Sequence, residues 1–200
     1  MLEQGMIRAT GHAKIFDPKT GEVFLDKDNS IHYENFSESM ALSFANKEYG
    51  RIFQMSFGNG ASSVDQTGVI TYLPPNSTGQ NAQLYNQTYA KVVDDTSTTN
   101  LDTARNNLTV IHTSGKVYTD ILVTCLLDFG EPSGQEVFDN STQLDGDYIF
   151  DELGIKTLFG SVNDTKLVTH LVFHPIAKSL NRQIQIDYTI RIQTLTYITA

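Results

Sequence analysis

The chain has 200 residues, 40% of them hydrophobic, which is enough to bury one substantial core without assuming a second domain. Its formal net charge is -9 and its 14 Lys and Arg residues are scattered singly. This pattern excludes the basic stripe that neutralises phosphates, so neither nucleic acid nor an anionic membrane is an expected partner.

Three further features of the sequence bear on the compartment. The longest apolar runs, such as residues 121–127, fall far short of the roughly 20 residues that cross a bilayer. The N-terminal sequence MLEQGMIRATGH lacks the apolar centre of a secretion signal. The single cysteine, Cys125, excludes an internal disulfide framework. We therefore expect a soluble, unprocessed chain that folds in a reducing compartment.

The first predicted element is a hairpin. Residues 13–16 and 22–25 flank the turn sequence DPKTG, in which Pro fixes one backbone angle and Gly accepts a positive φ. Residues 26–29 are predicted to form a polar turn, and residues 31–33 a short extended piece.

A single amphipathic helix is predicted at residues 35–46. Asn35 or Ser37 is the expected cap of its first turn. Its apolar residues at helical spacing are Phe36, Met40, Ala41, Phe44 and Ala45. This apolar stripe should cover one face of a sheet.

Strand patterns occupy most of the remaining chain. Residues 52–57 alternate with period two and place Phe53, Met55 and Phe57 on one face. Residues 108–113 and 116–128 bracket Ser114-Gly115, a strong hairpin signal, and the second of them is apolar on both faces, which is typical of a central strand. Shorter strands are predicted at residues 69–73, 88–93, 155–159 and 167–174, the last ended by Pro175, with loops at residues 76–83, 94–106 and 131–146.

The C-terminal stretch NRQIQIDYTIRIQTLTYITA carries the clearest strand pattern. Every even position from Ile184 to Ile192 is apolar and the odd positions are polar, which predicts a strand with one dry and one wet face. Beyond Ile192 the phase flips, because Leu195 and Tyr197 hold odd positions, so we predict a β-bulge at residues 193–194. Some eighteen residues span about 60 Å. The strand is longer than this domain needs to close its own sheet.

These elements together predict a mainly β fold. About ten strands, one amphipathic helix at residues 35–46 and no alternating β-α units favour an antiparallel β-sandwich or barrel, built as a single β-rich domain over residues 1–200.

The candidate chemical sites are weak. The sequence GNGASS at residues 58–63 resembles a phosphate loop but lacks the third glycine and the Gly-Lys-Ser/Thr ending, so a tight turn is favoured. His170 and His174 would lie roughly 13 Å apart on a strand, too far to share one metal. Cys125 lies in a strand between Val123 and Leu127, which favours core packing over nucleophilic catalysis.

An acidic group at Asp145, Asp147, Asp151 and Glu152 offers hard oxygen ligands for calcium. It does not match the order of an EF-hand loop, so a solvated loop is favoured. No nucleophile elbow or His-Glu-x-x-His motif occurs in the sequence. We expect a protein that is not an enzyme and has no cofactor or bound metal.

Six blocks carry a resemblance to a known family. In chain order they are DPKTGEVFLDKDNSIHYENFSESMALSFAN, MSFGNGASSVDQTGVITYLPPN, QLYNQTYAKVVDD, YTDILVTCLLDFGEPSGQ, YIFDELGIKTLFG and LVTHLVFHPIAKSLNRQIQIDYTIRIQTLT. They resemble structural proteins from virions of tailed bacteriophages, particularly contractile-tailed ones including cyanophages. The resemblance implies a non-enzymatic part of the virion, assembled in the host bacterial cytoplasm, with copies of itself and other phage structural proteins as partners.

The sequence leaves several positions in the particle open. A neck, collar or head-associated protein is the leading hypothesis; a capsid-decorating (cement) protein or a tail or baseplate component is the alternative. A carbohydrate-binding β-sandwich module is an alternative of another class, which would need Tyr72, Tyr85, Tyr89 and nearby Asn residues to form an exposed platform. The absence of Trp weighs against it.

Assembly arms are predicted at residues 1–11 and 193–200, because a strand added to a neighbour lets a small domain hold its partner through backbone hydrogen bonds in a symmetric homo-oligomer. The alternative is that both arms only close the domain's own sheet. The candidate assembly contacts are Gln193, Thr194, Leu195, Thr196, Tyr197 and Ile198.

Overall fold

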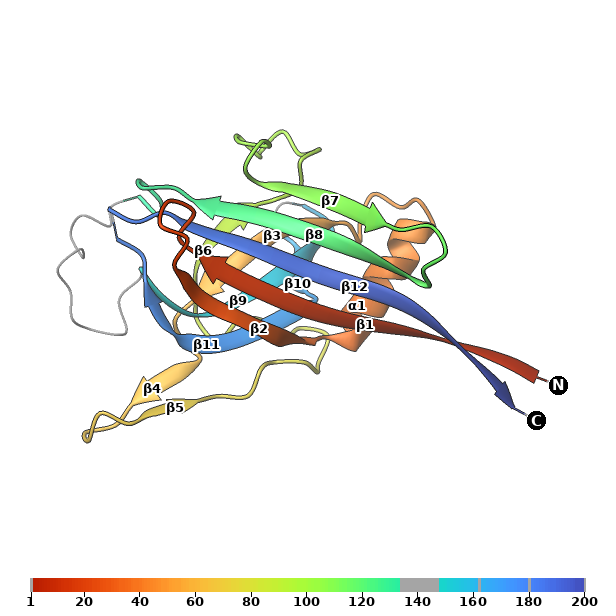
Figure 1. The fold of residues 1–200 in the computed structure, drawn as a ribbon, viewed down its shortest axis with the longest axis horizontal. Helices are drawn as coiled ribbons and strands as arrows, with labels where there is room; N and C mark the ends of the chain where they lie inside the picture. Colours follow the sequence, from red (N-terminus) through yellow and green to blue (C-terminus); the bar gives the residue numbers. More distant parts are fainter. Residues whose placement is uncertain (1, 134–147, 162, 180, 200) are drawn as a thin grey trace.

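The structure, a computed structural model, describes residues 2–133, 148–161, 163–179 and 181–199 (Figure 1). Its elements are β1 (Leu2–Phe16), β2 (Val23–Ile31), α1 (Tyr33–Phe44), β3 (Ile52–Gly58), β4 (Ser62–Val64), β5 (Ile70–Tyr72), β6 (Gln87–Val92), β7 (Asn107–His112), β8 (Tyr118–Leu127), β9 (Ile149–Leu158), β10 (Thr165–Leu167), β11 (Thr169–Ala177) and β12 (Ile184–Thr199).

Ten of the strands form one antiparallel sheet in the order β6-β3-β9-β11-β2-β1-β12-β8-β7, with β10 paired to β9. The sheet curls into a half-barrel, so its two halves face each other across a shared core, while β4 and β5 form a separate two-stranded hairpin (Figure 1). The predicted mainly β, antiparallel architecture with one helix is confirmed.

The core is filled from both halves by strands with the predicted period. On β12 the even residues Ile184, Ile186, Tyr188 and Ile190 are at most 2% exposed. They pack in one cluster with side chains of β3, β9 and β11. The alternation that defined the C-terminal strand therefore also defines which face of the sheet is dry.

The first two strands are longer than predicted. The hairpin around DPKTG is confirmed, with Gly21 at φ 77° and the Asp17 carboxylate accepting from the backbone N–H of Lys19. The polar turn predicted at residues 26–29 is wrong, because these residues belong to β2. Asp26 and Asp28 on β2 hydrogen-bond the ring of His12 on β1: the Asp26 carboxylate lies 2.7 Å from Nε2 and the Asp28 carboxylate 2.8 Å from Nδ1. Cross-strand partners thus make a polar run compatible with a sheet.

The helix prediction needs two corrections. Helix α1 runs from Tyr33 to Phe44, and its cap is His32, whose Nδ1 accepts from the backbone N–H of Asn35 at 3.2 Å, rather than Asn35 or Ser37. The face that it buries is polar: Asn35 Nδ2 donates to the carbonyl of Leu167, while Phe44 is 81% exposed. Hydrogen bonds to β10 and β9 hold the helix, together with Phe36, which packs against the core. The rest of the predicted apolar stripe is exposed at Ala41, Phe44 and Ala45.

Two details of the predicted strands are wrong. β11 continues through Pro175 to Ala177, with its register shift against β9 between Val172 and Ile176, so Pro occupies a bulge instead of ending the strand. The bulge predicted at residues 193–194 is wrong, since the register between β1 and β12 runs without a shift from Phe16↔Gln185 to Leu2↔Thr199. The change in the apolar pattern after Ile192 therefore occurs within a regular ladder, so Leu195 lies on the opposite face of the strand from Ile190.

Candidate functional site

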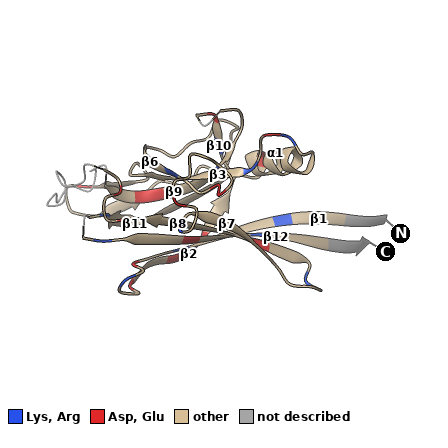
Figure 2. Ribbon diagram, turned by 90° about the horizontal axis from the view of Figure 1, so that it is seen from above, with Lys and Arg blue, Asp and Glu red and all other residues tan. Residues whose placement is uncertain are grey.

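The two chain ends form one projecting structure, which we call the terminal ribbon (residues 2–10 of β1 and 194–199 of β12). Its strands pair antiparallel, with Ile7 opposite Thr194 and Met6 opposite Leu195. Both strands extend beyond the body of the protein and end side by side (Figures 1 and 2). The predicted arms at residues 1–11 and 193–200 therefore pair with each other where the structure describes them.

The ribbon has two open edges. β2 pairs with β1 only from Gly11↔Asn29 onward, and β8 pairs with β12 only as far as Gln193↔Tyr118. One more backbone hydrogen bond, from Thr194 N–H to the Val117 carbonyl at 2.9 Å, ends the contact with the body. Across the described residues, the outer edges of residues 2–10 and 195–199 have no strand partner, so their backbone groups are free to pair with another chain.

The six predicted contact residues fall at and beyond the root of this ribbon. Gln193 is still in the ladder with β8, Thr194 makes the last bond to the body, and Leu195 is half-buried. Thr196, Tyr197 and Ile198 lie opposite Gly5, Gln4 and Glu3. Sequence reasoning named the arm at residues 1–11 without naming Met6 and Ile7, which are 48% and 56% exposed on opposite ribbon faces. Their adjacency in an otherwise polar segment was the available signal.

A fork-like ion pair holds the root of the ribbon to the body. The Arg191 guanidinium on β12 donates to both Asp120 carboxylate oxygens on β8, at 2.7 and 2.8 Å, and stacks 4.0 Å from the Tyr118 ring centre. The hydrogen bonds from Arg191 lower the pKa of Asp120. Planar bidentate pairing fixes direction as well as distance, so the ribbon leaves the sheet in a defined orientation.

A second polar cluster is buried in the body, around Glu152 on β9. Its carboxylate accepts from the backbone N–H groups of Tyr85 and Asn86, at 2.9 and 2.8 Å, and from Gly60 at 3.3 Å. His170 Nε2 lies 2.9 Å from the same carboxylate, and both side chains are fully buried. Burial raises the pKa of Glu152, but the hydrogen bonds from His170 and the two backbone N–H groups outweigh it, and the pKa is lowered.

The glycine-rich loop does bind an anion, and that anion belongs to the chain itself. The Asp151 carboxylate accepts from the N–H groups of Ala61 and Ser62, at 3.1 and 2.8 Å, and from the Ser62 hydroxyl at 2.5 Å. Residues 59–61 bend the chain between β3 and β4, which belong to different sheets. The solvated loop predicted for Asp151 and Glu152 is wrong, because both lie buried in β9. Asp145 and Asp147 lie outside the described residues.

Two buried histidines fasten the segment at residues 74–86. The N–H of Asn76 donates to His170 Nδ1 at 2.7 Å, so the proton of the neutral ring must lie on Nε2, facing Glu152. His32 has the same tautomer, since Nδ1 accepts from Asn35 and Nε2 donates to the carbonyl of Gly79 at 2.9 Å. His174 instead bonds the Tyr72 hydroxyl. His170 and His174 therefore have different hydrogen-bond partners, although both line the groove described next.

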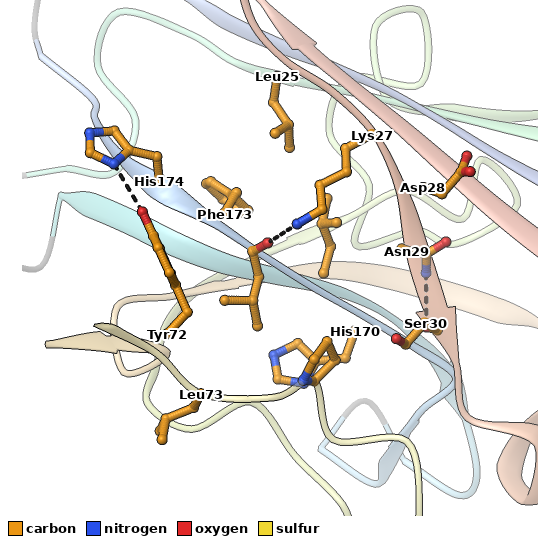
Figure 3. A pocket seen from close by; sticks show the side chains of 13 residues that line it. Leu25, Lys27, Asp28, Asn29, Ser30, Tyr72, Leu73, His170, Phe173 and His174 are labelled. Carbon is orange, nitrogen blue, oxygen red and sulfur yellow. Dashed lines mark hydrogen bonds between the residues drawn. The ribbon is translucent and has the colours of Figure 1, made fainter. Parts of the chain in front are cut away.

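An open groove lies beside this cluster, between β2, β11 and the segment after β5 (Figure 3). It has a volume of about 450 Å³, with Leu25, Leu73 and Phe173 among its apolar lining residues. Two of its polar groups have internal partners: Lys27 Nζ donates to the carbonyl of Val172 at 3.2 Å, and Tyr72 bonds His174 at 3.1 Å. The buried Oδ1 of Asn29, which also lines the groove, has no hydrogen-bond partner among the described residues.

The tyrosine platform that a carbohydrate-binding module would need does not form. Tyr72 lines the groove, whereas Tyr89 is half-buried on β6, with its ring centre 6.1 Å from that of Phe57 in the core. The Tyr85 hydroxyl donates to the carbonyl of Pro74 at 2.6 Å. The three rings therefore serve different parts of the fold.

Cys125 lies in the core with 0% exposure, as predicted. Burial raises the pKa of its thiol to about 12. Because thiol reagents attack the thiolate, we expect Cys125 to resist labelling in the native protein and to react fully after denaturation. Mass spectrometry with a maleimide checks this; rapid native labelling would contradict the burial.

Among the described residues, no three His, Cys, Asp or Glu side chains gather to hold a metal ion. Over the same part of the chain, no helix is long and apolar enough to cross a membrane. No protein-family model, curated protein or solved structure matches the chain. The functional proposal below rests on the terminal ribbon.

Proposed function

We propose that this chain is a non-enzymatic structural component of a tailed-bacteriophage virion, a neck, collar or head-associated protein that assembles through symmetric protein–protein contacts. The observation that carries the proposal is the terminal ribbon, with two open strand edges (Figures 1 and 2).

The ribbon suits assembly better than it suits folding. An isolated two-stranded ribbon is marginally stable in water, and open edges invite pairing with other chains. This ribbon exposes Met6 and Ile7 and contributes no side chain from residues 5–8 to the buried core. A partner that adds a strand or covers these faces would satisfy the backbone groups and bury the apolar side chains.

The buried polar clusters support a structural role over a catalytic one. Asp151 and Glu152 are the two acidic residues of β9, and both are buried. Their carboxylate oxygens accept hydrogen bonds from the loops that cover the strand. A general acid or base must reach a substrate proton. These carboxylates instead hold residues 60–62 and 85–86 in place. The sequence blocks that resemble phage virion proteins point to the same class of function.

Locating the protein in purified virions tests the proposal. Gold-labelled antibodies against this chain should bind at the junction between head and tail. Label over the whole head, with a copy number in the hundreds, would instead indicate a decorating protein, and label along the tail or at its base a tail component. Failure to find the chain in purified virions, by labelling and by mass spectrometry, would contradict the proposal.

A further inference from the structure

A further open strand edge lies on the body, where β8 separates it from β12 in the order of the sheet. β7 is the last strand of that order and pairs only with β8, from Asn107↔Thr124 to His112↔Thr119. Its other edge has no strand partner among the described residues. In Figure 1 it lies along the side of the molecule opposite the β4–β5 hairpin.

This edge lacks the usual protection against pairing. Natural edge strands are commonly blunted by a Lys, a Pro, a bulge or a covering segment. β7 reads NLTVIH, without any of these charged or breaking residues, and its register with β8 has no shift. Val110 is 69% exposed and Ile111 48%, and adjacent strand residues point to opposite faces, so apolar surface is exposed on both sides of the strand.

The opposite end of the sheet shows what a protected edge looks like in the same protein. β6 carries Lys91, whose ammonium donates to the carbonyl of Leu126 and pairs with Glu131. All residues of β6 after Gln87 are half-buried. The two end strands of this sheet therefore differ, and of these two it is β7 that combines an open edge with exposed apolar side chains.

We propose that β7 pairs with β7 of a second copy of this chain, antiparallel about a two-fold axis at Val110, so that the sheet continues from one copy into the other. A second copy fits this edge because β7 is self-complementary. Copies with a net charge of -9 repel each other, and an isologous contact brings each residue near its own equivalent. β7 has no Asp, Glu, Lys or Arg to oppose itself. About this axis Thr109 of each copy faces Ile111 of the other, a favourable β-branched pair.

This dimer is independent of the terminal ribbon and of the virion, so the purified protein tests it. Sedimentation velocity over a range of concentrations should show a monomer–dimer equilibrium. Val110→Lys places two like charges at the axis and should raise the dissociation constant at least about tenfold. Val69→Lys is the matched control, because Val69 is also exposed (55%) but lies in the β4–β5 turn, and it should leave the equilibrium unchanged.

A charge swap makes the test specific for the axis. Val110→Lys and Val110→Glu proteins should each be monomeric alone and form a mixed dimer when combined, because opposite charges then meet across the interface. Three results would overturn the proposal: a wild-type monomer at every concentration, equal effects of Val110→Lys and Val69→Lys, or no mixed dimer. Circular dichroism shows that each variant is folded, as expected for substitutions at exposed positions.

Discussion

Deletion of residues 194–200 is expected to give a folded protein that no longer enters phage particles. The deletion removes one strand of the terminal ribbon but leaves the ladder between β12 and β8, which ends at Gln193↔Tyr118. The lost segment borders β1 and bonds the body only through Thr194 and the Val117 carbonyl, so the free energy of unfolding should fall by no more than about 2 kcal/mol. Incorporation is measured by infecting cells that supply the truncated protein and by blotting the purified particles.

Point variants test whether the exposed apolar side chains of the ribbon, and not only its length, are needed for incorporation. Met6→Lys combined with Ile7→Lys keeps the strand but charges both exposed faces, and should also reduce incorporation. Val69→Lys, at an equally exposed position on the body, should not. If the truncated protein unfolds, the ribbon serves the domain's own sheet; if it folds and enters particles normally, the ribbon is not an assembly element.

Replacement of Glu152 by Ala should be the most damaging single substitution in the body. It leaves the N–H groups of Tyr85 and Asn86 and the buried ring of His170 without their acceptor. Breaking a buried charged network of this kind costs about 3–5 kcal/mol. For a chain of this size the melting temperature should fall by roughly 10 °C, measured by calorimetry.

The matched control is Glu38→Ala, because Glu38 also pairs with a cation but lies at the surface, where its bond to Lys166 is 2.7 Å long. A solvent-exposed pair contributes at most about 1 kcal/mol. Should Glu152→Ala fail to fold, Glu152→Gln retains one acceptor oxygen and should be intermediate. Equal melting temperatures for the Glu38 and Glu152 variants would show that the cluster does not hold the loops.

Acid should weaken the wild type at the same site. The pKa of Glu152 is lowered in the folded protein from its ordinary value of 4.5. A lowered pKa means that this stabilisation is complete above pH 4.5 and is lost as the pH falls through the folded-state pKa. The difference in unfolding free energy between wild type and Glu152→Ala should therefore shrink below pH 4.5. A constant difference would contradict the role of the ionised carboxylate.

Strands that bury one face and turns that depend on neighbouring residues were located correctly from the sequence. β12 and β3 have strict alternation, and their apolar faces are the buried ones. The DPKTG and Ser-Gly turns could be located because they contain Gly21 and Gly115, which adopt positive φ, at 77° and 82°, that few other residues accept. These features depend on neighbours in the chain, so sequence alone could specify them. The two-residue loop predicted at Ser114-Gly115 is wrong, because β7 ends at His112 and β8 begins at Tyr118.

Elements whose stability depends on distant partners could not be predicted. β9 is buried along its whole length, yet its Asp-Glu pair looks like a loop until residues 60–62 and 85–86 supply donors. The link from Glu152 to His170 crosses 18 positions without any local pattern. Helix α1 likewise buries Asn35 because the carbonyl of Leu167, 132 residues away, accepts from it.

The candidate site was predicted in part. Both arms were located from the surplus length of the C-terminal strand and the unpatterned N-terminus. Their mutual pairing was missed, since register between strands at opposite ends of a chain leaves no local trace. The predicted bulge at residues 193–194 was wrong for a related reason. Leu195 and Tyr197 interrupt the apolar alternation of the sequence, but the β1–β12 register continues without a shift.

The central claim is that neighbouring subunits hold this protein by its terminal ribbon. A cryo-electron microscopy map of the assembled virion, at a resolution that traces strands, tests it most directly. We predict that an edge of residues 2–10 or 194–199 is hydrogen-bonded to a strand of an adjacent subunit. A map in which the ribbon extends into solvent, with neighbours contacting only the body, would contradict the claim.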